Sequence, residues 1–227
     1  MKKVLSVIAI LIISTLCFAG CNFVKDKEAS TATSNEYFDF AEVEGGYSIS
    51  VKEGVTLPET VQLPSTYNEK DVVAVAKNAF KNNTTVTKVV IPEGYKTIGS
   101  EAFAFCTALK TLEIGSISGT TAKGTVIGMS AFKGCTSLYD VKLGKDVKEI
   151  GAYAFYETKI TSVVTLKNVE KIGACAFAKC SSLSRFYVPA SLVDIAEDAF
   201  EGSTNVKFEI AESNTAYDVV NNELVKL

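Results

Sequence analysis

The nine residues 172–180, "IGACAFAKC", recur along the chain with few changes. Close copies are "IGSEAFAFC" from Ile98, "IGMSAFKGC" from Ile127 and "IGAYAFYET" from Ile150, and looser copies are "VAKNAFKNN" from Val75 and "IAEDAFEGS" from Ile195. A catalytic motif normally occurs once in a domain, whereas recurrence at a nearly fixed spacing is typical of stacked repeats. This stretch therefore decides the fold.

The spacing of the Ala-Phe pairs predicts a solenoid. Successive phenylalanines are 23, 29, 23, 22 and 23 residues apart, and a period in the twenties is typical of stacked coils. A strand pattern such as "LKTLEIG" or "LYDVKLG" follows each pair. In the first three coils and the fifth, apolar positions 1, 4 and 6 face inward and positions 3 and 5 face outward. The six phenylalanines are Phe80, Phe103, Phe132, Phe155, Phe177 and Phe200.

Stacking gives each repeated residue a physical reason. Coils about 4.8 Å apart would place each phenylalanine on those above and below it. The "AFxxCxxL" segment has i, i+3 and i+6 spacing, which predicts a short helical turn between the two strand segments of each coil. A glycine without Cβ suits a tight bend or close packing before that turn, and four coils have one: Gly99, Gly128, Gly151 and Gly173.

The recurring pattern resembles the BspA-type leucine-rich repeat family over residues 61–210, in six repeats. The resemblance implies an α/β fold, a right-handed leucine-rich repeat solenoid with short parallel strands, short helical turns and about six repeats of 22–23 residues. We expect a single domain over 37–227, with a first coil at 37–74, repeats at 75–210 and a C-terminal cap at 211–227. The resemblance also implies an extracytoplasmic, cell-surface module for protein recognition or adhesion, without catalytic residues.

The N-terminus predicts export. Residues 1–21, "MKKVLSVIAILIISTLCFAGC", combine two lysines, an apolar run shorter than a membrane span and small residues. The ending "FAGC" resembles the lipobox of bacterial lipoproteins, so we expect a signal peptide over 1–20, a lipidated Cys21 and a flexible tether over 21–36. An ordinary cleaved secretory signal is the alternative. The expected location is the cell surface, with the lipid anchor as the contact with the membrane.

Composition argues against several function classes. Histidine is absent, which removes the usual general base of hydrolases and the commonest transition-metal ligand. The acid pairs of glycosidases could act without histidine, but no such pair stands out. Arg185 is the single arginine and the lysines are dispersed, unlike the clustered basic footprint of nucleic-acid binding. We expect no enzyme activity, cofactor, metal or nucleic-acid partner.

The cysteines allow two interpretations. Cys106, Cys135 and Cys180 occupy one repeat column, and Cys175 precedes Phe177 by two residues. Adjacent coils would bring Cys106 and Cys135 near the Cα separation of a disulfide, which an exported protein can form. The alternative is a column of small buried thiols that act as apolar filler.

Outward strand residues form the candidate binding face. Leucine-rich repeat proteins commonly bind through this sheet, and an arginine beside a tyrosine is enriched at interfaces. The loop 115–125, "GSISGTTAKGT", is either a neutral insertion or a contact loop beside the face. The candidate residues are Thr111, Glu113, Asp140, Lys142, Ser162, Val164, Arg185 and Tyr187, with Lys88 and Val90 before them.

The expected function is therefore adhesion or protein binding by a lipoprotein, with a host or neighbouring-cell protein as partner. A structural or assembly role in the bacterial envelope, through an endogenous protein or glycan, is the alternative.

Overall fold

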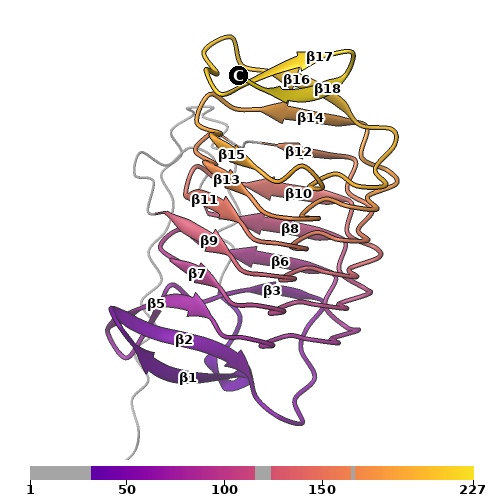
Figure 1. Cartoon of the computed structure of the whole chain (residues 1–227). Coiled ribbons are helices and arrows are strands. Elements are labelled where there is room, and N and C mark those ends of the chain that lie inside the picture. The colour runs from indigo at the N-terminus through magenta and orange to yellow at the C-terminus, as the bar shows by residue number, and fades with distance from the viewer. Residues whose placement is uncertain (1–31, 116–123, 165–166) are drawn as a thin grey trace, which may run out of the picture. The chain divides into compact units, whose positions relative to one another are not determined.

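The structure is a computed structural model that describes residues 32–115, 124–164 and 167–227. The expected signal peptide, Cys21 and the middle of the loop 115–125 lie outside these residues. In the described part the chain winds into stacked coils, each of which adds one strand to each of two sheets (Figure 1). The predicted solenoid of short parallel strands is confirmed.

The seven-stranded sheet carries the strands that follow the Ala-Phe pairs, together with β3 of the first coil. Its order is β16-β14-β12-β10-β8-β6-β3, and every neighbouring pair is parallel. Less accessible and more accessible residues alternate along β6, β8, β10 and β14, as the sequence pattern predicts. The strands are β3 (Thr60–Gln62), β6 (Lys88–Ile91), β8 (Thr111–Ile114), β10 (Asp140–Leu143), β12 (Ser162–Val164), β14 (Arg185–Val188) and β16 (Lys207–Ile210).

The second sheet holds the strands that precede the Ala-Phe pairs. Its order is β1-β2-β5-β7-β9-β11-β13-β15, and β4 pairs with β5 at its side. Only the β1–β2 and β4–β5 pairings within it are antiparallel. The strands are β1 (Phe38–Val43), β2 (Gly46–Val51), β4 (Thr66–Tyr67), β5 (Lys70–Val75), β7 (Thr97–Ile98), β9 (Thr125–Ile127), β11 (Val147–Ile150), β13 (Lys171–Ile172) and β15 (Asp194–Ile195).

Two hairpins lie at the ends of the stack. The β1–β2 hairpin, preceded by the 3₁₀ turn η1 (Asn35–Tyr37), adjoins the first coil, and the hairpin of β17 (Tyr217–Val220) and β18 (Glu223–Lys226) lies beyond the last one (Figure 1). The amide of Thr33 donates to the carbonyl of Gln62 at 2.8 Å. Thr33, in the segment 21–36 that the sequence assigns to a tether, therefore contacts the solenoid.

A ladder of phenylalanine rings fills the centre of the solenoid, as predicted. From Phe80 to Phe200, successive ring centroids are 4.5, 5.1, 5.3, 5.4 and 5.5 Å apart, and the planes differ by at most 16°. All are buried except Phe200, at the C-terminal end, which is half-buried. Each interior ring thus loses its water on both faces, and burial of this kind dominates the stability of a repeat array.

The predicted short helical turns are wrong. Among the described residues, helix is limited to η1, and the Ala-Phe segments form successive hydrogen-bonded turns instead. In the coil of Phe103, the residues Glu101 and Phe105 have φ of 56° and 60°, values that a right-handed helix cannot contain. The amides of Glu101, Phe103 and Phe105 donate to the next coil at 2.7–2.9 Å. Bonds between coils replace the i→i−4 bonds of a helix, because every coil has a neighbour.

The three cysteines of the column, Cys106, Cys135 and Cys180, are free, buried thiols, so the filler interpretation is confirmed for them. The Sγ atoms of Cys106, Cys135 and Cys180 lie 3.0–3.1 Å from the carbonyl oxygens of Phe80, Phe103 and Phe155, one coil earlier. Thr158 and Ser203 fill the same column with hydroxyls that donate to phenylalanine carbonyls. The column therefore selects small side chains with a donor hydrogen.

Burial makes these thiols unreactive in the folded protein. The hydrogen bond with Cys106, together with burial, raises the pKa of the Cys135 thiol well above its ordinary value, and burial raises that of Cys180. Since all three side chains are buried away from the reagent, we expect Cys106, Cys135 and Cys180 to be alkylated by iodoacetamide at least about 100-fold more slowly in the native than in the denatured protein. Peptide mass spectrometry after timed alkylation measures this, and equal native and denatured rates would contradict it.

Candidate functional site

The candidate face consists of two rows of outward side chains on the seven-stranded sheet. Parallel pairing in register places equivalent residues of successive coils side by side. The first row is Lys88, Thr111, Asp140, Ser162, Arg185 and Lys207. The second row contains Val90, Glu113 and Lys142, then the backbone position of Val164, and farther along the sheet Tyr187 and Glu209.

The structure thus brings together the predicted face residues. Thr111, Glu113, Asp140, Lys142 and Ser162 are partly accessible, and Arg185 and Tyr187 are exposed. For Val164 the structure describes the backbone, which lies in β12, but not the side chain. Their role in binding stays a prediction.

Glu113 is the centre of a charge network on this face. Its Oε1 atom lies 3.1 Å from the Lys88 Nζ and 3.3 Å from the Lys142 Nζ, on the two neighbouring strands. Partial burial raises the pKa of Glu113, but hydrogen bonds and charge from both lysines outweigh it and hold the pKa below its usual value. The carboxylate is therefore ionised at neutral pH, and its attraction to the lysines is lost as the pH falls through its folded-state pKa.

Arg185 and Tyr187 give the C-terminal part of the face a different character. The Arg185 Nε lies 3.3 Å from the Glu209 Oε1, but both side chains are more than half exposed. Such a pair contributes little to stability, so the guanidinium remains available to a partner. Tyr187 is 46% exposed, which is unusual for a large aromatic side chain in the middle of a strand.

The sequence analysis missed the face residues of both outer strands of the sheet. At the N-terminal end, Thr60 of β3 pairs with Lys88 and Gln62 with Val90. Lys207 and Glu209 of β16 extend the two rows by one strand, since Lys207 pairs with Arg185 and Glu209 with Tyr187. The strand pattern "VKFEI" contained the signal, because both residues occupy its outward positions.

In the described ranges no three cysteine, aspartate or glutamate side chains gather in a way that could hold a metal ion. A helix with the length and hydropathy to cross a bilayer does not occur in this part of the chain.

Comparison with protein families identifies the repeat. A model described as the BspA type leucine rich repeat region matches in six copies, over residues 73–124 and 116–219. The chain belongs to the BspA-type leucine-rich repeat family. The BspA-type repeat is a protein-binding or adhesion-like module, and its solenoid is typically a non-catalytic scaffold.

Solved structures show the same BspA-type architecture. A T. pallidum leucine-rich repeat protein is 22% identical, with a TM-score of 0.52 and coverage of 78% of this chain and 70% of that one. A leucine rich cell surface protein from Faecalibacterium prausnitzii is 21% identical (TM-score 0.55, 88% and 59% covered). A leucine-rich repeat protein from Bacteroides ovatus is 26% identical (TM-score 0.56, 78% and 52% covered). No curated protein matches the chain.

Proposed function

We propose that this chain is an exported lipoprotein, anchored through Cys21, which binds a protein partner at the outward face of the seven-stranded sheet. The observation that carries the proposal is the register of β6 to β16, which lines up two rows of mostly polar side chains that include the exposed Arg185 and Tyr187. The lipobox-like ending of the leader supports the anchor. The F. prausnitzii protein, which is described as a cell surface protein, supports the location.

The chemistry of the face favours a protein with mixed charge. The carboxylates of Glu113 and Asp140 balance the charges of Lys88 and Lys142, so this part of the face does not attract a highly charged polymer. Tyrosine and arginine are the residues that most often dominate binding energy at protein interfaces. We expect Tyr187 and Arg185 to anchor the partner and the Glu113 network to contribute specificity.

The size of the face sets a limit on the interaction. The sheet surface formed by six strands about 4.8 Å apart, each about four residues long at about 3.3 Å per residue, has an area of roughly 380 Å². A standard interface buries about 800 Å² on each side, so the strands supply about half of it. Flanking turns must supply the rest, and the half-exposed Tyr139 lies directly before β10.

Protease treatment of intact cells tests the location. Peptides from residues 84–207 are expected in the supernatant when intact cells are treated with trypsin and the released peptides are identified by mass spectrometry. Release only after lysis would contradict surface display. It would favour the envelope role, in which the partner is endogenous.

Substitution of Tyr187 tests the face. Tyr187→Ala is expected to weaken binding of a partner captured by the native protein by about 30-fold, because a central aromatic anchor contributes about 2 kcal/mol. The dissociation constant is measured by surface plasmon resonance. Tyr153→Ala, which truncates an exposed tyrosine on the Ala-Phe turns rather than on the sheet, is the matched control. Equal losses in both variants would contradict the assignment of the face.

A further inference from the structure

The Ala-Phe turns of successive coils are joined by a ladder of backbone hydrogen bonds. In each interior coil the amides two residues before, at and two residues after the phenylalanine point toward the next coil. In the coil of Phe103, the amide of Phe103 donates to Ala131 at 2.7 Å and that of Phe105 donates to Lys133 at 2.8 Å. The turn segment of each coil is therefore a template for the next.

The last coil leaves this template open. The equivalent amides of the last coil belong to Asp198, Phe200 and Gly202, and none of them donates to an acceptor among the described residues. The β17–β18 hairpin instead accepts hydrogen bonds from the last strand of each sheet. Its Tyr217 hydroxyl accepts from the amide of Ile195, the last residue of β15, and its Asn222 side chain accepts from the amide of Phe208 in β16. The edges of both sheets are capped, whereas the turn edge between them is not.

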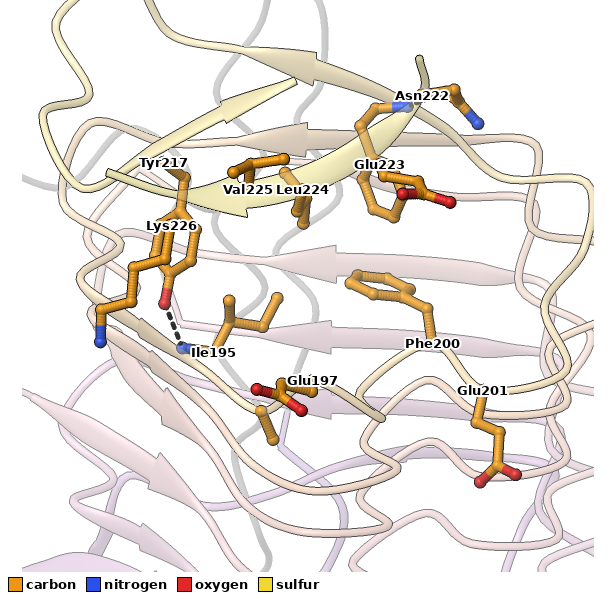
Figure 2. A pocket seen from close by; sticks show the side chains of 12 residues that line it. Ile195, Glu197, Phe200, Glu201, Tyr217, Asn222, Glu223, Leu224, Val225 and Lys226 are labelled. Atoms are coloured by element: carbon orange, nitrogen blue, oxygen red, sulfur yellow. Dashed lines mark hydrogen bonds between the residues drawn. The ribbon is translucent and has the colours of Figure 1, made fainter. Parts of the chain in front are cut away.

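A cavity lies where the next coil would continue. It has a volume of about 680 Å³ and opens between the last coil and the β17–β18 hairpin (Figure 2). Its apolar lining includes Ile195, Phe200, Phe208 and Leu224, each of which is half-buried and packs against the core. Phe200 lacks the ring that covers each earlier phenylalanine of the ladder on this side. The cavity therefore offers an apolar floor for one more large side chain.

The charges around the cavity are mostly negative. Glu197, Glu201 and Glu223 line it together with one cation, Lys226. No lysine or arginine of the described chain forms an ion pair with any of the three glutamates. Figure 2 shows Glu223 and Glu201 on opposite sides of the Phe200 ring. A basic side chain that accompanies the apolar one would thus find acidic partners.

We propose that this end of the solenoid binds a short, turn-forming peptide segment of a partner protein, in which an apolar side chain is followed by a basic one. Carbonyl groups of the segment accept from the free amides of Phe200 and Gly202, as one coil accepts from another. The apolar side chain enters the cavity against Phe200, and the basic side chain lies near the glutamates. Main-chain bonds provide affinity, and the side-chain pocket provides specificity. The site is separate from the sheet face and does not depend on it.

The chain itself shows what such a ligand looks like. Residues 128–134, "GMSAFKG", present the carbonyls of Met129, Ala131 and Lys133 to the amides of the preceding coil at 2.7–2.9 Å. The Phe132 ring stacks on Phe103 at 5.1 Å, and a lysine follows it. A synthetic peptide of this sequence, blocked at both ends, is therefore a suitable probe.

Titration of ¹⁵N-labelled protein with this peptide tests the proposal. We expect saturable shifts that are largest for the amides of Phe200 and Gly202, which move downfield as they gain an acceptor, while the amide of Tyr187 on the sheet face does not move. The peptide GMSAAKG, which lacks the ring, should bind at least tenfold more weakly. Absence of saturable shifts, shifts centred on the sheet face, or equal affinity for both peptides would overturn the proposal.

A charge variant provides the second test. Glu197→Lys combined with Glu223→Lys is expected to weaken binding of the peptide at least tenfold, and both residues are exposed, so the fold should tolerate the change. Glu212→Lys, an exposed acid that does not line the cavity, is the matched control. An unchanged dissociation constant in the double variant would remove the role of the glutamates and contradict the proposed ligand chemistry. Variants at Tyr187 should leave peptide binding unchanged, which separates this site from the sheet face.

Discussion

Truncation of Phe155 to alanine is expected to destabilise the repeat domain by about 3–5 kcal/mol, the range for removal of a buried aromatic ring. The Phe155 ring is fully buried, with centroids 5.3 Å from Phe132 and 5.4 Å from Phe177. Its loss removes two stacking contacts and leaves a cavity that rigid neighbouring coils cannot close. Since the chain contains no tryptophan, urea denaturation followed by far-UV circular dichroism is the suitable measurement.

The control for this substitution is Phe105→Ala. Phe105 lies on the outer side of an Ala-Phe turn and is 41% exposed, so its truncation should cost less than about 1 kcal/mol. Because stability in a solenoid is shared between neighbouring coils, the Phe155 variant is also expected to unfold less cooperatively. A loss below about 1 kcal/mol for Phe155→Ala would contradict the view that the ring ladder carries the stability of the array.

The ring ladder could be predicted from the sequence because it depends on repetition alone. Six phenylalanines at one repeat position must stack if the coils stack, and no other structural information is needed. The two rows of face residues follow in the same way from alternation within equivalent strands. For this reason Thr111, Asp140 and Ser162 were placed correctly beside one another.

The conformation of the turns could not be predicted by the same reasoning. Apolar residues at i and i+3 suit a helical turn and a pair of stacked β-turns equally well, and only the partner of each amide separates the two. That partner lies in another coil. A weaker signal was present, since Asn78, Asn82 and Gly134 occupy the left-handed positions, where asparagine and glycine are favoured.

The cavity at the C-terminal end was beyond sequence analysis for a related reason. Its existence depends on how the β17–β18 hairpin covers the last coil. Tyr217 and Asn222 direct the hairpin to the two sheet edges, but neither is distinguished in the sequence from other polar residues of the tail. The position of the hairpin relative to the last coil creates this site, and no sequence pattern within either element indicates it.

Replacement of Gly151 by alanine is expected to destabilise the domain by about 3 kcal/mol, the upper part of the range for overpacking. Gly151 does not have a positive φ. Close packing, rather than backbone conformation, therefore requires glycine at this position. A Cβ there would lie 2.8 Å from the carbonyl oxygen of Ile127 and 2.9 Å from two further backbone atoms of the preceding coil. These atoms belong to the hydrogen-bonded stack and cannot move like a flexible side chain, so the coils must separate locally.

The free-energy cost of a Cβ at this repeat position should depend on where the coil lies in the stack, and the residues found at the two ends of the stack agree with this expectation. The equivalent residue is alanine in the outermost copies, at Ala76 and Ala196, where the neighbour on one side is a hairpin rather than a further Ala-Phe coil. Ala196→Gly is therefore the control, with an expected loss below about 1 kcal/mol from backbone entropy alone. Both variants are compared by urea denaturation under one set of conditions. A loss of less than about 0.5 kcal/mol for Gly151→Ala would show that the interior coils can separate to admit a methyl group, and close backbone packing would no longer explain the repeated glycine.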